Sequence, residues 1–276
     1  MRREQEDRIF TTERTMETIG FFGDSFCELL NNQHSIDNNY RTYMELCVDE
    51  LHLKIVNTGM GGSSLYDMVL KQLNPLIKSN SIPDVCVFFY TIPQRLYHPV
   101  CRSIHMSNAL NGYNSKKEEW FSKTYPNEKN WFSKDIWDAA QQYFMHLYDE
   151  EKSQLEYLSF LQYIDNNILS QLKNTKIINL WSIGNVKNWD LDSFKPENIN
   201  YVHDWKHGVE VRPALMSLSA VNGNTFKYPM IDDRPNHLDG QLKNDMVFDY
   251  IVKALENYDE GVLLDYTDGV NKLWNA

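Results

Sequence analysis

Short apolar runs alternate with longer helical segments along most of this 276-residue chain. The clearest run is DVCVFFY at residues 84–90, which is continuous, β-branched and aromatic, as strands buried on both faces are. The predicted strands are residues 19–23, 53–57, 84–90 and 176–181, with residues 208–211 as a shorter candidate. The predicted helical segments are residues 37–51, 64–79, 135–174 and 238–258. Pro75 is expected to kink or end the second segment, and the third is expected to contain two helices.

This alternation predicts βαβ units, whose right-handed crossovers produce a parallel sheet with helices on both faces. The expected fold class is therefore α/β, a three-layer α/β/α arrangement around a parallel, five-stranded sheet. Because no linker-like stretch separates the early motifs from the late ones, residues 16–276 are expected to form one domain, with an irregular insertion around residues 95–134. Residues 1–15 are charged and polar and are expected to be a disordered leader.

Composition excludes several function classes. The formal net charge of -11 argues against nucleic acid as the main partner, because phosphate binding needs a basic surface. The sequence has neither a secretory signal nor an apolar run of about 18 residues, so no membrane segment is expected. Four cysteines, Cys27, Cys47, Cys86 and Cys101, lack metal-pair or disulfide-framework spacing. Free thiols in a reducing, cytoplasmic compartment are the expected state.

A serine follows the first predicted strand in the segment TIGFFGDSFC, residues 18–27. Gly23 permits a sharp turn without a Cβ clash, and Asp24 and Ser25 come directly after it. In open α/β sheets, binding and chemistry occur at the carboxyl ends of the strands, which is where this serine should lie. Ser25 is therefore a candidate nucleophile.

An activated serine needs a base within hydrogen-bond reach and a third group that orients the base. The segment DDRPNH near the end of the chain supplies both residue types. His237, which is expected to begin the last predicted helix, is the candidate base, and either Asp232 or Asp233 is the candidate orienting carboxylate. The glycine-rich stretch at residues 59–64, GMGGSS, follows the second strand, and its backbone can approach a substrate closely at the same edge.

In this order the motifs resemble those of the SGNH (GDSL-type) hydrolase family. FGDSF at residues 22–26 resembles the first family block, VNTGMGGSS at residues 56–64 the second, and NHL at residues 236–238 the end of the last. The resemblance implies a flavodoxin-like three-layer fold and hydrolysis or transfer of acyl esters, with no cofactor and no metal. It also implies that the N–H groups of Ser25 and Gly62 form the oxyanion hole.

The chain departs from the family pattern in two places. An aspartate lies four or five positions before His237, where the family usually has three. The third block normally contains an asparagine that donates to the oxyanion, but here the strand continues as YTIPQR at residues 90–95. Thr91, Gln94 and Arg95 are the candidate replacements. Arg95 is favoured because it is long, always charged and donates through a rigid fork.

Other signals are weaker. His203 and His207 are four residues apart, as zinc-binding histidines on a helix are, but the metalloprotease glutamate is missing and the neighbours are not helical. Cys27 is a rival nucleophile without an electropositive neighbour. Three tryptophans in or beside the insertion are expected to pack over the hydrophobic core. Stacking of their rings on sugar rings is the alternative. They are Trp120, Trp131 and Trp137.

The sequence thus predicts a serine esterase that acts on short-chain acyl or O-acetyl esters of a small molecule or a carbohydrate. The first alternative is an O-acyltransferase that uses the same residues and a sugar acceptor. The second is a catalytically inactive SGNH domain that binds carbohydrate or a protein. The oligomeric state is left open.

Overall fold

The computed structural model describes residues 16–28, 40–99, 102–124, 133–184, 186, 192–221, 226–227, 233–234, 238 and 240–275. Within these residues, six strands form one sheet in the order β10-β7-β6-β3-β1-β2, and every neighbouring pair is parallel. The strands are β1 (Thr18–Phe22), β2 (Lys54–Asn57), β3 (Val85–Tyr90), β6 (Lys176–Trp181), β7 (Val209–Arg212) and β10 (Leu263–Asp265). Two short antiparallel pairs join β4 (Arg95–Leu96) to β5 (Ile104–His105) and β8 (Phe226–Lys227) to β9 (Asp233–Arg234).

The order of the strands is that of a flavodoxin-like, doubly wound sheet extended by one strand. The predicted three-layer α/β/α class is confirmed, but the predicted count of five strands is wrong. The additional strand, β10, pairs with β7 at one edge of the sheet. Its sequence LLD is short, and two of its three residues are exposed, so it lacks the apolar run by which the other strands were predicted.

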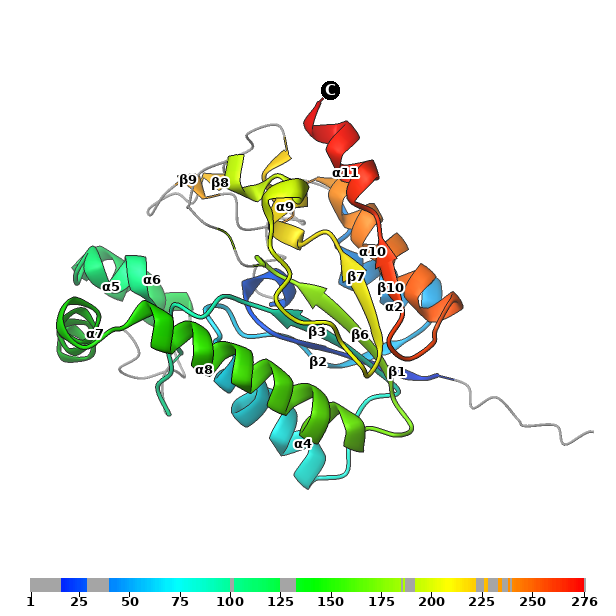
Figure 1. Cartoon of the computed structure of the whole chain (residues 1–276), viewed down its shortest axis with the longest axis horizontal. Helices are drawn as coiled ribbons and strands as arrows, with labels where there is room; N and C mark the ends of the chain where they lie inside the picture. The colour runs from blue at the N-terminus through cyan, green and yellow to red at the C-terminus, as the bar shows by residue number, and fades with distance from the viewer. Residues whose placement is uncertain are drawn as a thin grey trace, which may run out of the picture.

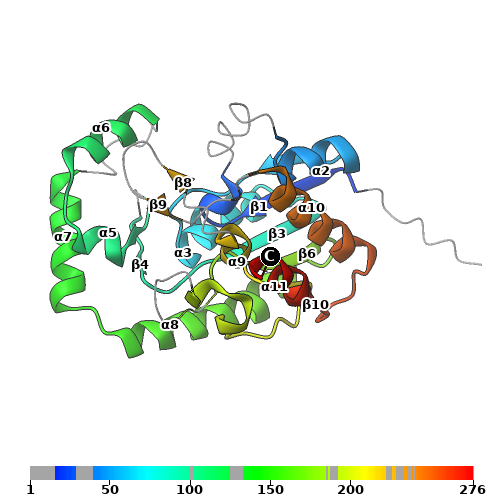
Figure 2. The same ribbon diagram turned by 90° about the horizontal axis from the view of Figure 1, so that it is seen from above.

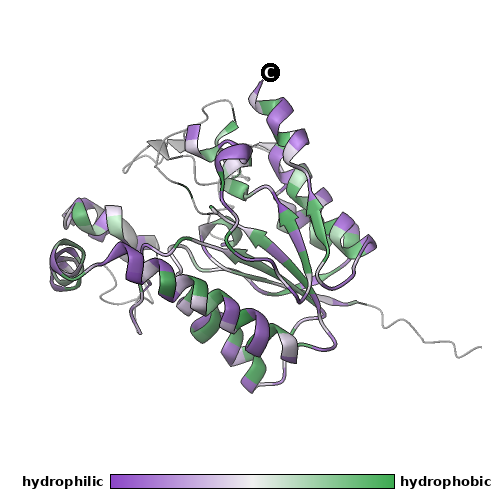
Figure 3. Cartoon of the chain, viewed as in Figure 1, coloured by the Kyte–Doolittle hydropathy of each residue, from purple (hydrophilic) through white to green (hydrophobic). Residues whose placement is uncertain are grey.

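Side chains of the central strand β3 point alternately into the two helical layers. Val85, Val87 and Phe89 pack with α2 (Tyr43–Leu51), α10 (Gln241–Glu256) and α11 (Thr267–Trp274). Cys86, Phe88 and Tyr90 pack with α3 (Leu65–Asp67), η3 (Met68–Leu73) and α8 (Glu150–Tyr163). Figure 1 shows these helices on opposite faces of the sheet, and Figure 3 shows that its strands are mainly hydrophobic. A strand covered on both sides needs apolar residues at every position, as β3 has.

The helix predicted around Pro75 does not stop at the proline. The chain runs from α3 through the π-helical segment η3 into α4 (Asn74–Lys78), where Pro75 occupies the first turn. Proline has no N–H to donate, and a first helical turn needs none. The π turns of η3 end at Leu73, two residues before the proline that interrupts the hydrogen-bond ladder.

The predicted irregular region after β3 contains regular elements. These are β4, β5, α5 (Met106–Leu110) and α6 (Ser115–Thr124), followed by α7 (Lys134–His146). Ile104, Ala109 and Phe144 share a small core with Trp137, which is 3% exposed. Trp137 is therefore a core residue. The side chain of Trp120 and all of Trp131 lie outside the described residues, as do residues 1–15.

Helices α5, α6 and α7 form a lobe beside the sheet, on the side toward which the strands run (Figures 1 and 2). The remaining short helices are η1 (Ser25–Cys27), η4 (Ile164–Ile168), η5 (Leu169–Gln171), η6 (Asp192–Phe194), η7 (Pro196–Asn198) and α9 (Leu215–Ser219). Across the described part of the chain, no helix has the length and apolar character needed to cross a membrane.

Replacing a buried side chain of α8 tests the packing of this layer on the sheet. Leu161 is 0% exposed and Leu155, on the same helix, is 66% exposed. Leu161→Ala should lower the free energy of unfolding by about 2–5 kcal/mol, because it leaves a cavity between helix and sheet. Leu155→Ala should change it by less than about 0.5 kcal/mol. Urea denaturation of both variants measures the difference, and equal effects would contradict the packing described here.

Candidate functional site

The predicted nucleophile lies in a tight turn that follows β1. We call residues 23–27 the serine turn. Gly23 has φ +152°, and a Cβ there would lie 2.6 Å from Phe89 Cβ and 2.7 Å from the Phe89 carbonyl oxygen. Asp24 caps η1 by accepting a hydrogen bond from the N–H of Phe26 at 3.1 Å. Ser25 is the first residue of η1 and is half-buried at the carboxyl edge of the sheet.

The glycine-rich stretch after β2 lies directly on the serine turn. We call residues 59–64 the glycine turn. The N–H of Gly59 donates to the carbonyl of Cys27 at 2.8 Å, and the N–H of Met60 donates to the carbonyl of Gly23 at 3.0 Å. A Cβ on Gly59 would lie 2.2 Å from Cys27 Sγ. Only a glycine permits this close approach of the two turns.

Gly62, the predicted oxyanion donor, has φ +79° and lies in the half-buried part of the glycine turn. The atom nearest to a Cβ at this position would be the Ser103 carbonyl oxygen, at 3.6 Å. The constraint on Gly62 is therefore its left-handed backbone rather than crowding.

A buried glutamine in η3 holds both turns. Gln72 accepts the N–H of Gly23 at 2.9 Å and donates to the Gly23 carbonyl at 2.8 Å and to Ser63 Oγ at 3.1 Å. One amide side chain thus fixes the peptide groups on both sides of Gly23. The sequence analysis missed Gln72, because a polar residue in a helical segment gives no sign that it faces the sheet.

Asp24 joins the ends of three strands. Its Oδ1 accepts a hydrogen bond from Ser182 Oγ at 3.0 Å, directly after β6. Its Oδ2 accepts a hydrogen bond at 3.2 Å from Nη2 of Arg95, which lies in the segment after β3. Arg95 Nη1 also donates to the Ser63 carbonyl at 2.7 Å. The predicted third oxyanion donor therefore bridges the serine turn and the glycine turn.

The other two candidates for that donor lie in the same segment. Thr91 is 2% exposed, and its hydroxyl has no hydrogen-bond partner within the described residues. The Thr91 carbonyl accepts a hydrogen bond from the Tyr157 hydroxyl. The carbonyl of Gln94 accepts from the N–H of Met106 at 2.9 Å.

A second buried arginine supports the glycine turn. Arg102 Nη1 lies 2.6 Å from Glu28 Oε1 and donates to the Gly61 carbonyl at 2.9 Å. The Arg102 and Glu28 side chains are 4% and 6% exposed, so removal of either one would leave a charge buried without its partner. The sequence analysis did not single out this pair, whose members are 74 positions apart.

Cys27 is not suited to be the nucleophile. Burial raises the pKa of its thiol well above the ordinary value, and the nearby carboxylates of Asp24 and Glu28 raise it further. A cysteine reacts as the thiolate, which this environment disfavours.

Of the other predicted triad residues, Asp233 alone is among the described residues. His237 and Asp232 lie outside the described residues. Asp233 belongs to β9, where its backbone pairs with Lys227. Helix α10 begins at Gln241 and is followed by α11, so the prediction that His237 begins the last helix is wrong.

The two histidines considered as possible zinc ligands both contact the carboxylate of Asp165. His203 Nε2 lies 3.2 Å from Asp165 Oδ2, and His207 Nδ1 lies 2.9 Å from Asp165 Oδ1. Among the described residues, no group of three or more His, Cys, Asp and Glu side chains is arranged to hold a metal ion. Burial raises the pKa of Asp165, but hydrogen bonds from His203, the Lys206 N–H and His207 outweigh it and lower the pKa to about 2.

Comparison of the chain with protein-family models found no match, and comparisons with curated proteins and with solved structures found none either.

Replacing Gln72 tests how the serine turn is held. Gln72→Leu should lower the free energy of unfolding by about 1–3 kcal/mol, because the N–H of Gly23 loses its acceptor while it stays buried. Gln171→Leu, at an exposed position, is the matched control and should change it by less than about 0.5 kcal/mol. Chemical denaturation measures both, and a neutral Gln72→Leu would show that the turn does not depend on this side chain.

Asp165 should contribute a pH-dependent part of the stability. Its pKa is lower in the folded protein than the unfolded value of about 3.9, so folding favours its charged form. The contribution, about 2 kcal/mol, is present above pH 4 and is lost as the pH falls toward 2. Asp165→Asn should therefore be less stable than the original protein at pH 7, and the gap should narrow below pH 4.

The exposed neighbour Asp204 provides the control, since Asp204→Asn should leave the stability unchanged within about 0.5 kcal/mol. Thermal unfolding followed by circular dichroism between pH 2.5 and 7 measures the gap. A gap of constant size over this range would contradict the role of the charged Asp165.

Proposed function

We propose that this protein is a serine esterase of the SGNH type, with Ser25 as the nucleophile. The supporting observation is the contact between the serine turn and the glycine turn at the carboxyl edge of β1 and β2. In a doubly wound sheet of this strand order, ligands bind where the connections diverge to the two sides, beside β1 and β3. Ser25 follows the first of these strands, and the segment that carries Arg95 follows the second.

In the proposed reaction, Ser25 Oγ attacks the acyl carbon of the ester as His237 takes the hydroxyl proton. The tetrahedral intermediate collapses, the C–O bond to the alcohol breaks, and His237 gives the proton to the leaving oxygen. Water then attacks the acyl-enzyme by the same steps and releases the acid. Asp232 or Asp233 orients His237 and stabilises its charged form.

The negative oxygen of the intermediate needs donors that are already in position. We assign this role to the N–H groups of Ser25 and Gly62, with Arg95 as the third donor in place of the family's asparagine. The bonds from Arg95 to Asp24 and Ser63 fix its guanidinium between the two turns. A guanidinium carries five N–H donors in a planar fork, which suits it to an anionic acceptor.

The proposed substrates are short-chain acyl esters, including O-acetyl groups on small molecules or carbohydrates. A cytoplasmic location is part of this proposal and is supported by Cys27, Cys47 and Cys86, which are free and buried. Transfer of the acyl group to a sugar hydroxyl would use the same residues, and product analysis with a sugar acceptor present separates it from hydrolysis.

Labelling with a fluorophosphonate probe tests the nucleophile. The folded protein should be labelled covalently at Ser25, and Ser25→Ala should abolish the labelling. His237→Ala should slow the labelling by orders of magnitude, because the serine then has no base. Asp232→Asn and Asp233→Asn should differ in their rates of labelling. The variant that removes the orienting carboxylate should be labelled about 10³–10⁴-fold more slowly, and the other should be labelled at nearly the original rate.

The exposed serine variant Ser159→Ala, on α8, controls for nonspecific labelling. A folded protein that is never labelled would contradict the esterase proposal and favour the inactive binding module. Labelling that persists in Ser25→Ala would place the nucleophile elsewhere.

A further inference from the structure

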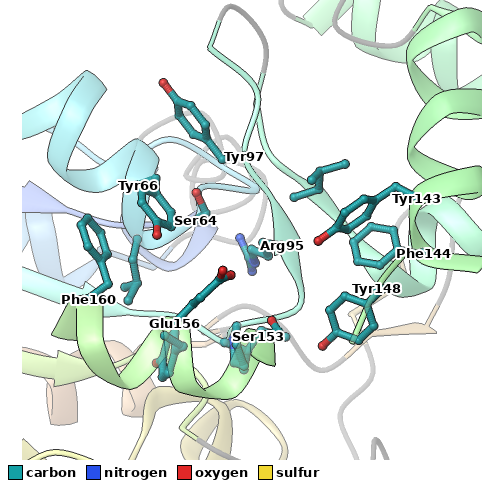
Figure 4. Close-up of a pocket in the computed structure, with 15 residues that line it drawn as sticks. Ser64, Tyr66, Arg95, Tyr97, Tyr143, Phe144, Tyr148, Ser153, Glu156 and Phe160 are labelled. Carbon is teal, nitrogen blue, oxygen red and sulfur yellow. The ribbon is translucent and has the colours of Figure 1, made fainter. Parts of the chain in front are cut away.

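A pocket of about 200 Å³ lies beside the glycine turn (Figure 4). Four segments that are distant in the sequence form its walls: the start of α3, the chain after β3, the end of α7 with Tyr148 beyond it, and α8 from Ser153 to Phe160. Its lining joins the sheet domain to the lobe of α5, α6 and α7. Among its lining residues, the sequence had pointed to Arg95 and, within the glycine-rich stretch, to Ser64.

One wall of the pocket consists of Tyr66, Tyr97 and Phe160. The rings of Tyr66 and Phe160 stack with centroids 4.2 Å apart and an interplanar angle of 13°, and Tyr97 lies 5.9 Å from Tyr66. Tyr66 is 41% exposed, so the aromatic surface of this wall is open to a ligand.

The other wall is formed by Tyr143 and Phe144 of α7 and by Tyr148, which follows the end of that helix. Their ring centroids are 5.2–6.4 Å apart, so they hold one another in place. In Figure 4 the two aromatic groups lie on opposite sides of Arg95. A ligand in the pocket would therefore meet aromatic side chains on two sides.

Polar groups lie between the walls. The Arg95 side chain is 9% exposed and is fixed by its bonds to Asp24 and Ser63. The carboxylate of Glu156 points toward Arg95 in Figure 4, and its side chain is 58% exposed. Ser64 and Ser153 add hydroxyl groups to the lining. The pocket thus combines apolar walls with a polar interior of both charges.

We propose that this pocket binds a neutral pyranose ring. Such a ring presents C–H groups on its faces, which suit aromatic walls, and hydroxyl groups around its rim, which both donate and accept hydrogen bonds. Arg95 can donate to these hydroxyls and Glu156 can accept from them. An aliphatic chain would instead displace water from the exposed Glu156 carboxylate without replacing its hydrogen bonds, which is costly.

The position of the pocket gives the sugar a role that rests on the proposed esterase function. Arg95 lines the pocket and also binds Asp24, the residue before Ser25. A sugar held here would contact Arg95, which binds the residue that precedes the proposed nucleophile. The sugar would be the alcohol part of the ester, so the substrate would be an acylated pyranoside.

Binding can be measured without catalysis. The full-length Ser25→Ala protein is titrated with methyl β-D-glucopyranoside, methyl β-D-galactopyranoside and cyclohexylmethanol, and saturation-transfer NMR gives each Kd. At least one pyranoside should bind, and more tightly than cyclohexylmethanol, an apolar ring without the hydroxyl rim. Tyr66→Ala should weaken the binding about tenfold, whereas Tyr66→Phe, which keeps the ring, should stay within about threefold.

Tyr163→Ala is the matched control. Tyr163 is also an exposed tyrosine, and its ring stacks on Phe160 at 6.0 Å, but it does not line the pocket. This variant should leave the affinity unchanged. The inference is overturned if neither pyranoside binds, if cyclohexylmethanol binds as tightly, or if Tyr163→Ala weakens binding as much as Tyr66→Ala.

Failure of the esterase proposal would give a different result. A protein that binds the pyranoside but is never labelled by fluorophosphonate keeps the sugar site and loses the hydrolytic role. A protein that is labelled at Ser25 but binds no pyranoside keeps the nucleophile and loses the sugar site.

Discussion

The parallel arrangement of the strands decides where the connecting segments of this protein meet. Because every strand of the main sheet runs in the same direction, the segments that follow β1, β2, β3 and β6 emerge at one edge. The buried carboxylate of Asp24 lies where these segments meet. It accepts hydrogen bonds from Ser182, which follows β6, and from Arg95, in the segment after β3. Ser182 and Arg95 are 158 and 71 positions from Asp24 in the sequence, and both are thereby bound to the residue that precedes Ser25.

Close backbone contact then sets the shape of that edge. The serine turn and the glycine turn approach so closely that a Cβ at Gly59 would overlap Cys27. A Cβ at Gly23 would overlap Phe89, and one at Gly61 would overlap the Glu28 carboxylate. Gln72 and the buried Arg102–Glu28 pair hold these peptide groups from two sides. The proposed oxyanion hole therefore rests on fixed backbone, which is what stabilisation of a developing charge requires.

Sequence reasoning predicted the elements that carry a strong local signal. The buried run of β3 and the turn at Gly23 are examples, because their hydrophobic pattern and backbone freedom are visible in a few residues. It missed β10, which has three residues, two of them exposed, and it placed the start of α10 too early. The bond from Arg95 to Asp24 and the aromatic pocket could not be predicted, because they depend on which distant segments the fold brings together.

The convergence of Ser25 and His237 at one edge of the sheet is the central claim. A crystal structure that resolves residues 232–237 tests it most directly, through the distance between Ser25 Oγ and the nearer imidazole nitrogen. The account predicts hydrogen-bond reach, about 3 Å, with an aspartate on the other ring nitrogen. An imidazole that faces away from Ser25, with no other base beside the hydroxyl, would contradict it.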